Sequence, residues 1–406
     1  MSKRLTCDVV VIGAGMVGAA CALYLARAGL VTLVLDRGPV AGGTTGAGEG
    51  NLLVSDKEPG PELDLALLSA RLWHDLAAEP GMGGAVEFEA KGGIVVASDA
   101  AGMAALTGFA AGQRAAGVEA EVVGAGRLAD LEPHLASDLA GGVRYPQDCQ
   151  VMPSLAAAQV VRAARRAGAA LYTGTAVTDI LRAPDGSVRG VRAAGHGDIH
   201  APVVVNAAGT WGGEVAALAG VRLPVLPRRG FVLVTEPLPP GTVRHKVYAA
   251  DYVADVGSGD AGLQSSAVVE STAGGPVLIG ASRERVGFDR TFSLPVVRRL
   301  AAQATALFPV LGTVHAMRAY LGFRPYLPDH VPAIGADPRV PGLYHACGHE
   351  GAGIGLSVGT GHLIGQSLTG RPPDLDLTPF RPDRFEEKQE KDVKEKDFGE
   401  KEAGKR

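Results

Sequence analysis

The first strongly hydrophobic pattern in the chain is an unbroken apolar run at residues 9–12, long enough for one buried strand. A second apolar run covers residues 32–35, and Asp36 follows it directly. Between the two runs, apolar and small residues from 16 to 26 are typical of a helix packed against a sheet. The pattern therefore predicts a strand, a helix and a second strand, in the order of a parallel α/β unit.

The turn between the first strand and the helix carries Gly13, Gly15 and Gly18. In a dinucleotide-binding unit, such glycines permit a tight turn, backbone approach to a pyrophosphate and close helix–strand packing. The helix N-terminus offers N–H groups and partial positive charge to phosphates, and Asp36 is placed to accept hydrogen bonds from ribose hydroxyls. The segment therefore predicts an adenine dinucleotide site, in which Met16, Val17 and Arg37 adjoin these residues.

Further apolar patterns extend the α/β prediction along the chain. They favour helices at 62–76, 100–116, 127–131, 153–167, 295–308 and 353–368. They favour strands at 86–88, 94–97, 177–181, 188–191, 203–205, 231–234, 267–269, 277–279 and 342–345. The strands at 86–88 and 94–97 are expected to pair, residues 184–186 signal a hairpin turn, and the glycine-rich segment 42–51 is expected to be a loop.

Composition narrows the class of protein. The chain has 406 residues, of which 46% are hydrophobic and 20% charged, as in folded globular proteins of about two or three domains. A net charge of −4 without a basic concentration argues against nucleic acid as a partner. Four scattered cysteines show no metal-binding spacing, so reduced thiols, no metal site and a cytoplasmic location are expected.

Both termini carry expectations of their own. The first residues lead directly into a strand, which leaves no room for a signal peptide, and no apolar window reaches the roughly 18 residues of a membrane span. Residues 381–406 hold 18 charged positions among 26, nine of each sign, and are expected to form a disordered tail or a frayed helix.

Three more motifs follow the glycine turn along the chain. They lie at residues 206–211 (Asn-Ala-Ala-Gly-Thr-Trp), 322–329 (Gly-Phe-Arg-Pro-Tyr-Leu-Pro-Asp) and 348–354 (Gly-His-Glu-Gly-Ala-Gly-Ile). With them, residues 7–380 resemble the D-amino-acid oxidase type of FAD-dependent oxidoreductases, which includes glycine oxidase, sarcosine oxidase and amino-acid dehydrogenases. The resemblance implies an α/β fold, with a Rossmann-like FAD-binding domain and a substrate domain on a mostly antiparallel sheet.

The two ends of the chain must meet in such a fold, because the dinucleotide and flavin motifs lie at opposite ends of the sequence. We therefore expect a discontinuous FAD-binding domain from residues 1–83, 143–222 and 324–380. The substrate domain is expected from residues 84–142 and 223–323.

The resemblance also assigns further FAD contacts. The glycine-rich turn before the last helix offers backbone donors and a positive dipole end to the flavin edge that becomes negative on reduction. The alternative is that the glycines of the helix serve only helix packing, and both can hold. The positions expected to contact FAD are Thr44, Thr45, Gly48, Val177, Ala208, Gly209, Trp211, Gly348, Gly351, Ala352, Gly353 and Ile354. For Val177, an ordinary core position is an equally good description.

Arg324 is the residue expected to bind substrate. Pro325 holds it in an extended conformation, and a guanidinium in a partly dry pocket pairs bidentately with a carboxylate. In the family, the matching arginine holds the amino-acid carboxylate; a surface salt bridge is the alternative.

At position 49 the sequence departs from the more common motif of the family by carrying glutamate. It resembles the branch that contains hydrogen cyanide synthase, hydroxyproline dehydrogenase and opine dehydrogenase subunits. Glu49 is expected to face the substrate amine or a guanidinium, or else to cap a helix or lie on the surface.

Three further residues are candidates for the catalytic site. Tyr248 and Tyr252 lie on a segment that overhangs the pocket in the family, although ordinary strand packing is the alternative for each. His349 is expected to lie beside the flavin, kept neutral by the helix dipole, with a positioning role favoured over that of a general base.

The sequence thus predicts oxidation of the C–N bond of a small amino acid or a carboxylate-bearing secondary amine, by hydride transfer to flavin N5. Because residues 324–329 contain no cysteine, FAD is expected to be bound non-covalently. The electron acceptor is oxygen or a partner protein, the latter in a multi-subunit dehydrogenase that is peripheral to a membrane through that partner. A flavin-binding subunit without catalysis is the third alternative.

Overall fold

The computed structural model describes residues 5–252 and 257–386 and contains a central six-stranded sheet in the order β19-β20-β13-β2-β3-β9. Strands β20, β13, β2, β3 and β9 run parallel, and β19 adds an antiparallel edge. The two strands of the predicted unit, β2 and β3, pair in register with each other, and β13 pairs in register with β2. Val11 therefore lies between Val34 and Val205. Their bounds are β2 Val9–Ile12, β3 Thr32–Leu35, β9 Ala170–Tyr172, β13 Val203–Asn206, β19 Ala333–Ala336 and β20 Leu343–Cys347.

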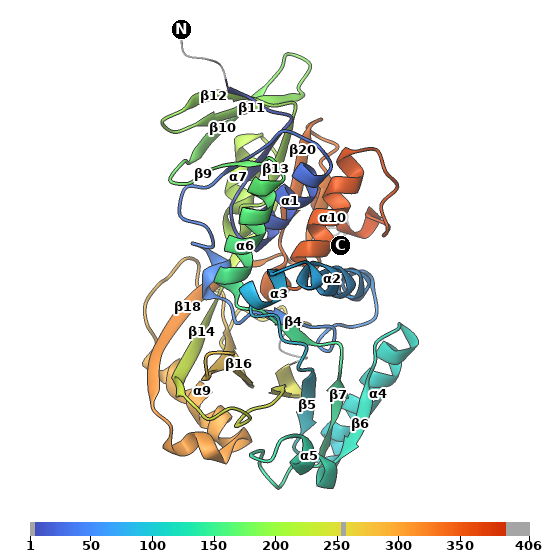
Figure 1. The fold of residues 1–406 in the computed structure, drawn as a ribbon, viewed down its shortest axis with the longest axis vertical. Helices are drawn as coiled ribbons and strands as arrows, with labels where there is room; N and C mark the ends of the chain where they lie inside the picture. The colour runs from blue at the N-terminus through green and yellow to red at the C-terminus, as the bar shows by residue number, and fades with distance from the viewer. Residues whose placement is uncertain (1–4, 253–256, 387–406) are drawn as a thin grey trace, which may run out of the picture.

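Helices from opposite ends of the chain pack together beside this sheet. Figure 1 shows α1 (Met16–Arg27) in blue beside α10 (Ser357–Leu368) in red, with α6 (Pro153–Arg166) next to α1. A Cβ on Gly361 would lie 2.6 Å from the carbonyl carbon of Ala20, so only glycine permits this approach. The packing role expected of the α10 glycines is therefore confirmed at Gly361. Helix α2 (Pro61–Ala78) covers the other side of α10, and α3 (Met82–Ala85) follows it.

A four-stranded sheet, in the order β1-β12-β11-β10, extends this half of the molecule. The hairpin predicted around residues 184–186 joins β10 to β11, and Gly186 adopts a φ of +87° in its turn. Helix α7 (Gly212–Leu218) follows β13. The strands are β1 Leu5–Thr6, β10 Val177–Arg182, β11 Val188–Ala193 and β12 Gly197–His200.

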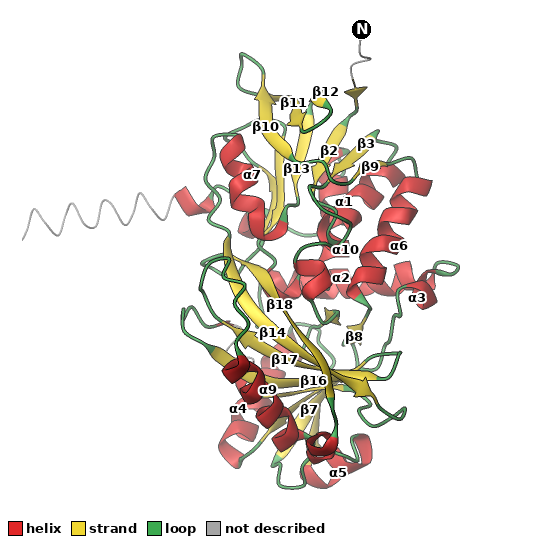
Figure 2. Cartoon of the chain, turned by 90° about the vertical axis from the view of Figure 1, so that its left-hand side faces the viewer, coloured by secondary structure: helices red, strands yellow, loops and turns green. Residues whose placement is uncertain are grey.

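The other half of the molecule is built on an eight-stranded sheet in the order β18-β14-β17-β16-β15-β5-β7-β6. All its neighbours are antiparallel except β15 and β5. Helix α9 (Leu294–Leu307) packs on one face, where its apolar residues join the core around Phe231 (Figure 2). The strands are β5 Gly93–Ala97, β6 Glu121–Gly124, β7 Gly141–Tyr145, β14 Leu226–Pro237, β15 Lys246–Ala249, β16 Gln264–Ser271, β17 Pro276–Arg283 and β18 Ala316–Tyr326.

The predicted α/β architecture, with a parallel sheet and a second, mostly antiparallel one, is confirmed. The expected domain division remains a proposal, and its boundaries at 143 and 324 fall inside β7 and β18. Helices α4 (Ala100–Ala115) and α5 (Ala125–Leu131) flank the eight-stranded sheet, and the pair β4 (Asn51–Leu52) and β8 (Cys149–Gln150) connects the halves.

Three local predictions were wrong. Residues 86–88 form a turn after α3 rather than a strand, because the amide of Phe88 bonds back to Gly83 and Glu87 adopts a φ of +51°. The segment 42–51 is not wholly irregular, since it contains a 3-10 helix at Thr44–Ala47 and the first residue of β4. The last α-helix begins at Ser357 and not at 353, because a short 3-10 helix, Glu350–Ala352, and a turn precede it.

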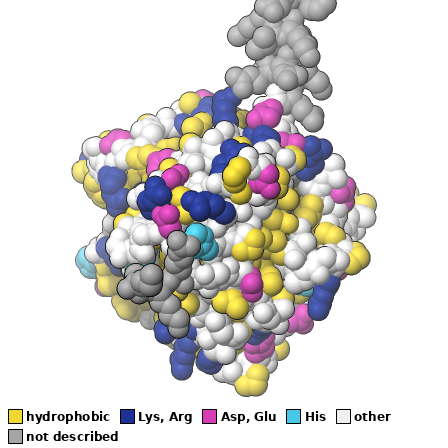
Figure 3. Space-filling view, turned by 90° about the horizontal axis from the view of Figure 1, so that it is seen from above, with side chains coloured by type: hydrophobic (Ala, Val, Ile, Leu, Met, Phe, Trp, Pro, Cys, Tyr) yellow, Lys and Arg dark blue, Asp and Glu magenta, His cyan; other side chains and the backbone are white. Residues whose placement is uncertain are grey.

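The surface and the chain ends add two observations. On the face shown in Figure 3, basic and acidic side chains are interspersed. None of the helices within residues 5–252 and 257–386 is long and apolar enough to cross a membrane. The prediction of a disordered tail falls mainly on residues 387–406, outside the described residues. Its first part is attached, since Arg384 pairs with Asp329 at 2.8 Å.

Candidate active site

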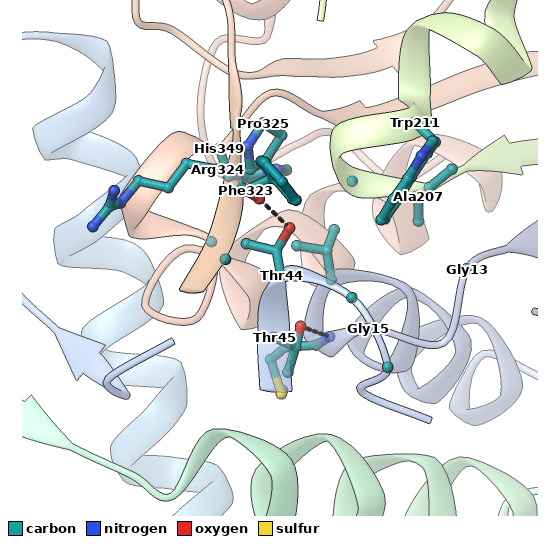
Figure 4. Close-up of a pocket in the computed structure, with 18 of the residues that line it drawn as sticks. Gly13, Gly15, Thr44, Thr45, Ala207, Trp211, Phe323, Arg324, Pro325 and His349 are labelled. Atoms are coloured by element: carbon teal, nitrogen blue, oxygen red, sulfur yellow. Dashed lines mark hydrogen bonds between the residues drawn. The ribbon is translucent and has the colours of Figure 1, made fainter. Parts of the chain in front are cut away.

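A cavity of about 410 Å³ lies where the carboxyl ends of β2, β3 and β13 face the eight-stranded sheet (Figure 4). Its walls come from segments far apart in the sequence: the glycine turn, the loop after β3, the start of β10, the end of β13, strands β14 and β18, and the turn before α10. Ligands of open α/β sheets bind at this carboxyl edge. The cavity therefore collects most of the predicted site residues.

The glycine turn forms one end of the cavity, with Gly13, Gly15, Met16 and Val17 in the lining. Gly13 has a φ of +114°, and a Cβ there would lie 2.4 Å from the carbonyl oxygen of Ala207. Gly18 lies behind the lining, where its own Cβ would meet the Gly13 oxygen at 1.9 Å. The first glycine therefore shapes the turn against β13, and the third one packs the helix on the turn.

Two side chains hold this turn in place. Asp36 accepts a hydrogen bond from the amide of Ala14 at 2.6 Å through one oxygen and from Gly38 at 2.7 Å through the other. The Thr45 hydroxyl accepts from the amide of Met16 at 3.0 Å, the first residue of α1 (Figure 4). Asp36 and Thr45 both line the cavity, so each combines support of the backbone with a surface for a ligand.

The adjoining wall is aromatic and apolar. The guanidinium of Arg37 lies 4.2 Å from the centre of the Trp211 ring, and that ring also stacks on Phe288 with ring centres 5.4 Å apart. Val177 lines the cavity, as do Ala208 and Gly209, which follow β13. These positions lie where the sequence predicts contacts with the adenosine and pyrophosphate parts of FAD, and those contacts remain predictions.

The turn before α10 closes the middle of the cavity. Gly351, Gly353 and Ile354 line it, whereas Gly348 and Ala352 do not. Gly348 has a φ of +81°, and a Cβ there would lie 2.1 Å from Leu327, so it shapes the turn. The cavity is thus lined by a 3-10 turn ahead of the helix and not by the first turn of α10 itself.

His349 also lines the cavity and is 3% exposed. Its Nε2 lies 2.9 Å from the hydroxyl of Thr360. Burial lowers the pKa of His349 to about 3, so the ring is neutral at ordinary pH. The expected neutrality therefore comes from burial and not from the dipole of α10, which begins eight residues later.

The loop after β3 brings Thr44, Gly48 and Glu49 to the cavity. The Thr44 hydroxyl donates to the carbonyl oxygen of Phe323 at 2.6 Å and thereby fastens the loop to β18 (Figure 4). Glu49 is 8% exposed, and its Oε1 has no hydrogen-bond partner among the described residues. A Cβ on Gly280 would lie 2.1 Å from that oxygen, so β17 carries glycine where the carboxylate lies.

Arg324 lies at the far end of the cavity, and in Figure 4 its side chain extends away from Trp211 and the glycine turn. Its Nη1 donates to the carbonyl oxygen of Ser282 at 2.8 Å after crossing β14 at Gly230, where a Cβ would lie 2.2 Å from Nη1. Burial and then the nearby charge of Arg283 lower the pKa of Arg324, though not enough to discharge a guanidinium. Arg324 donates to backbone and forms no ion pair with another described residue, so the surface salt bridge considered from the sequence is not seen.

The two candidate tyrosines have different surroundings. Tyr252 lines the cavity and packs edge-on against Tyr248 with ring centres 4.9 Å apart. Tyr248 is fully buried behind it, and its hydroxyl donates to Ser55 at 2.6 Å. The structure therefore places Tyr248 in strand packing, outside the lining, because β15 lies behind the Tyr252 segment.

A buried charge pair lies beneath Glu49. Lys246 and Glu270, on adjacent strands, are separated by 3.6 Å and are almost fully buried. Burial lowers the pKa of Lys246, but the carboxylates of Glu270 and Glu49 outweigh it and raise that pKa. The ammonium therefore remains charged. Burial raises the pKa of Glu270 to about 7, and the charge of Lys246 opposes that rise.

Sequence reasoning missed several residues of the site. Gly230 and Gly322 allow the strands β14 and β18 to approach the cavity, and Glu350 is held there by Arg228 and His330. Gly322, Phe323 and Pro325 adjoin Arg324, so the third motif offered a signal for them. Lys246, Glu270 and Arg283, which adjoin the cavity without lining it, had none, because only strand pairing brings them together.

The comparisons with known proteins agree with this geometry. The model of the family described as FAD dependent oxidoreductase (DAO) matches residues 8–367. The chain belongs to this family. Membership follows from a match over most of the chain, and the protein is therefore an FAD-dependent oxidoreductase.

Similar members of the DAO family align over nearly their full length. Hydrogen cyanide synthase subunit HcnC of Pseudomonas aeruginosa is 29% identical over 94% of this chain and 97% of its own. Glycine oxidase of Geobacillus kaustophilus is 30% identical over 92% and 96%, respectively. The crystal structure of glycine oxidase from Geobacillus kaustophilus superposes with a TM-score of 0.84, covering 94% of this chain and 99% of that one.

The residues present fit FAD, the cofactor of the DAO family. Glycine occupies the positions where a Cβ would fill the turn, and Asp36 is set at the end of β3, as a dinucleotide requires. Gly351 and Gly353 leave backbone exposed to the cavity for a flavin ring. The four cysteines within the described residues are buried and lie outside the lining, which supports the prediction of non-covalent binding.

Proposed function

We propose that this protein oxidises the C–N bond of a small amino acid, or of a secondary amine that carries a carboxylate, to the corresponding imine. The observation that carries the proposal is Arg324, a partly buried guanidinium that lines the cavity at the end opposite the dinucleotide turn. A guanidinium in such a place binds a carboxylate bidentately and fixes its orientation. Both relatives named glycine oxidase and HcnC are consistent with this assignment.

The chemistry divides between the cofactor and the protein. FAD, when bound, supplies the acceptor for the hydrogen and the two electrons that leave the substrate carbon. Arg324 holds the carboxylate, and the carboxylate of Glu49 accepts hydrogen bonds from the amine, whose nitrogen loses a proton as the C=N bond forms. Tyr252 packs against the substrate. His349, which is neutral, positions the turn at 350–354 through Thr360.

The test is anaerobic loss of visible flavin absorbance on addition of glycine, sarcosine, proline, D- and L-alanine and opines. We expect at least one of these compounds to bleach the wild-type protein rapidly. The Arg324→Met variant should retain FAD but require far higher concentrations. If no amine in the panel bleaches a protein that holds FAD, the proposal fails and a flavin-binding subunit without catalysis is favoured.

A second candidate differs in the electron acceptor. Because one relative is named as a subunit of hydrogen cyanide synthase, the chain is also a candidate for the flavin subunit of a multi-subunit dehydrogenase. Oxygen consumption by the isolated chain, compared with reduction of an artificial dye, separates the two. Rapid oxygen use identifies an oxidase, whereas dye reduction without oxygen use identifies a dehydrogenase.

A further inference from the structure

A second guanidinium, that of Arg283, the last residue of β17, lies beside the substrate end of the cavity, behind its lining. Arg283 is 4% exposed, and its Nη1 is buried without a hydrogen-bond partner in the part of the chain that the structure describes. Its Cζ lies 4.8 Å over the ring of Tyr252, which lines the cavity. A buried charge without an ionic partner is costly, so its retention calls for a ligand or a neighbour that neutralises it.

The guanidinium of Arg324 reaches the backbone next to Arg283. Arg324 crosses Gly230 and donates to the carbonyl oxygen of Ser282, the residue that precedes Arg283. The charge of Arg283 contributes, after burial, to the lowered pKa of Arg324. The two cations therefore repel each other across a low-dielectric space, and an anion that binds there relieves the repulsion.

By contrast, two neighbouring buried arginines have carboxylate partners. Arg228 pairs with Glu350 and donates to Gln264 at 2.7 Å. Arg229 pairs with Glu284 at 2.8 Å and with Asp289 at 2.6 Å. Both are on β14, within the same sheet as Arg283 and Arg324. Among the described residues, neither Arg283 nor Arg324 has a carboxylate partner in an ion pair.

The third charge at this end is the carboxylate of Glu49, which lines the cavity and leaves Oε1 unpartnered among the residues described. Lys246 and Glu270 balance each other behind it. Glu350 also lines the cavity, but it is paired with Arg228 and His330. Among the described residues, the charges without an ionic partner at or beside the substrate end are therefore two cations, Arg283 and Arg324, and one anion, Glu49. Their complement is a molecule with two carboxylates and one ammonium group.

We propose that Arg283 binds a second carboxylate, so that the preferred substrate is an amine flanked by two carboxylates, in a dicarboxylic amino acid or an iminodiacid. This inference rests on the proposed function, in which Arg324 binds the first carboxylate. The rival arrangement, in which both guanidinium groups grip one carboxylate, makes a different prediction for the binding of acids.

The test uses acids without nitrogen, which cannot form an imine. Dissociation constants of oxydiacetate and methoxyacetate, and of succinate and butyrate, are measured on the FAD-loaded protein by calorimetry and by perturbation of the flavin spectrum. We expect at least one diacid to bind about 10- to 100-fold more tightly than its monoacid partner, as for one added charge-assisted pair. Arg283→Met should abolish that preference and change monoacid binding by less than about threefold.

Arg285→Met is the matched control. Arg285 lies two residues further on, its guanidinium 5.0 Å over Tyr326, and its Nη2 donates to Gly259 outside the cavity lining. The control should keep the diacid preference. Absence of a preference in the wild-type protein, or an equal loss of mono- and diacid binding in Arg283→Met, would overturn the proposal, and the latter result would indicate one shared carboxylate.

Turnover assays distinguish the two positions at which the substrate can carry the second carboxylate. Iminodiacetate carries it on the nitrogen substituent and D- or L-aspartate on the side chain, with sarcosine and alanine as the matched monocarboxylates. Selective loss of iminodiacetate or aspartate oxidation in Arg283→Met supports the proposal and identifies the source. If no amine is oxidised while the diacid preference persists, the proposed oxidation fails and the second carboxylate site stands.

Discussion

The two ends of the cavity are built on opposite principles. At the dinucleotide end, backbone groups and glycines form the surface, and the polar side chains present are already used, as Asp36 and Thr45 are by amides of the turn. At the substrate end, Arg324 and Glu49 form part of the surface. Glu49 and, behind Tyr252, Arg283 keep buried atoms without partners among the described residues. The first end is thus satisfied before a ligand arrives, whereas the second is proposed to be completed by its ligand.

The two ends of the cavity differ in which property a substitution is expected to change, either stability or specificity. A binding surface made of backbone and glycine leaves no room for an added Cβ, but it needs no counter-charge. Substitutions there are therefore expected to act through steric clash. A charged pocket tolerates small changes of shape, but it loses binding energy when one charge is removed. Variants at the two ends should therefore fail in different ways.

The largest effect is expected from Gly13→Ala at the dinucleotide end. The new Cβ would lie 2.4 Å from the Ala207 oxygen at a φ of +114°, so β2 and β13 must separate, at a cost above about 4 kcal/mol. The purified variant should be colourless, as measured by flavin absorbance. Gly29→Ala is the control, since its φ is +87° with no atom within 4 Å, and it should retain FAD. A yellow Gly13→Ala protein would contradict the steric account.

The next effect is expected from Arg324→Met at the substrate end. Removal of the guanidinium should reduce kcat/KM for the best amino acid about 100- to 1,000-fold, mainly through KM, while FAD content stays unchanged. Steady-state kinetics on Arg318→Met provide the control, because Arg318 is an exposed residue of the same strand. Near-normal kinetics in Arg324→Met would assign the carboxylate to another group.

A smaller effect, on the pH dependence of stability, is expected at His349, which lies between the two ends of the cavity. Burial holds its pKa at about 3 in the folded protein against 6.5 in the unfolded chain, so the unfolded state binds more protons between these values. The stability that depends on this ring is full above pH 6.5 and falls as the pH decreases, by about 2 kcal/mol at pH 5. His349→Gln should lessen the loss of stability on acidification.

The measurement for His349 is denaturant unfolding of the apoprotein at pH 5 and pH 7. His315→Gln serves as control, because the His315 side chain is 86% exposed. Its acid sensitivity should match that of the wild-type protein. An identical loss of stability in His349→Gln and the wild type would show that the ring is not held neutral.

The smallest effect is expected from Thr45→Val. The change removes one hydrogen bond to the amide of Met16, worth about 1 kcal/mol of unfolding free energy, and should weaken FAD binding less than about tenfold. Thermal unfolding and FAD titration measure the two quantities, with Thr178→Val as an exposed control. A loss of FAD as complete as that in Gly13→Ala would mean that the hydroxyl, and not the backbone, dominates this end.

The dinucleotide end was largely determined by the sequence alone. Its strand, glycine turn, helix and acid lie within residues 9–36, so their spacing in the chain fixes their spacing in space. The motif at 322–329 likewise singled out Arg324, because its neighbours Gly322 and Pro325 constrain the backbone. Local patterns failed at residues 86–88 and at the start of α10, where a turn and a 3-10 helix replace the expected strand and helix.

The charge pattern of the substrate end was decided only by the tertiary structure. Glu49, Lys246, Glu270, Arg283 and Arg324 lie on a loop and four different strands, and their meeting depends on the strand order of the eight-stranded sheet. Burial, which no local pattern reveals, makes His349 neutral and leaves Tyr248 outside the cavity. Short-range geometry is encoded in neighbouring residues, whereas the electrostatics of a pocket arise from which distant residues the fold brings together and how much water it excludes.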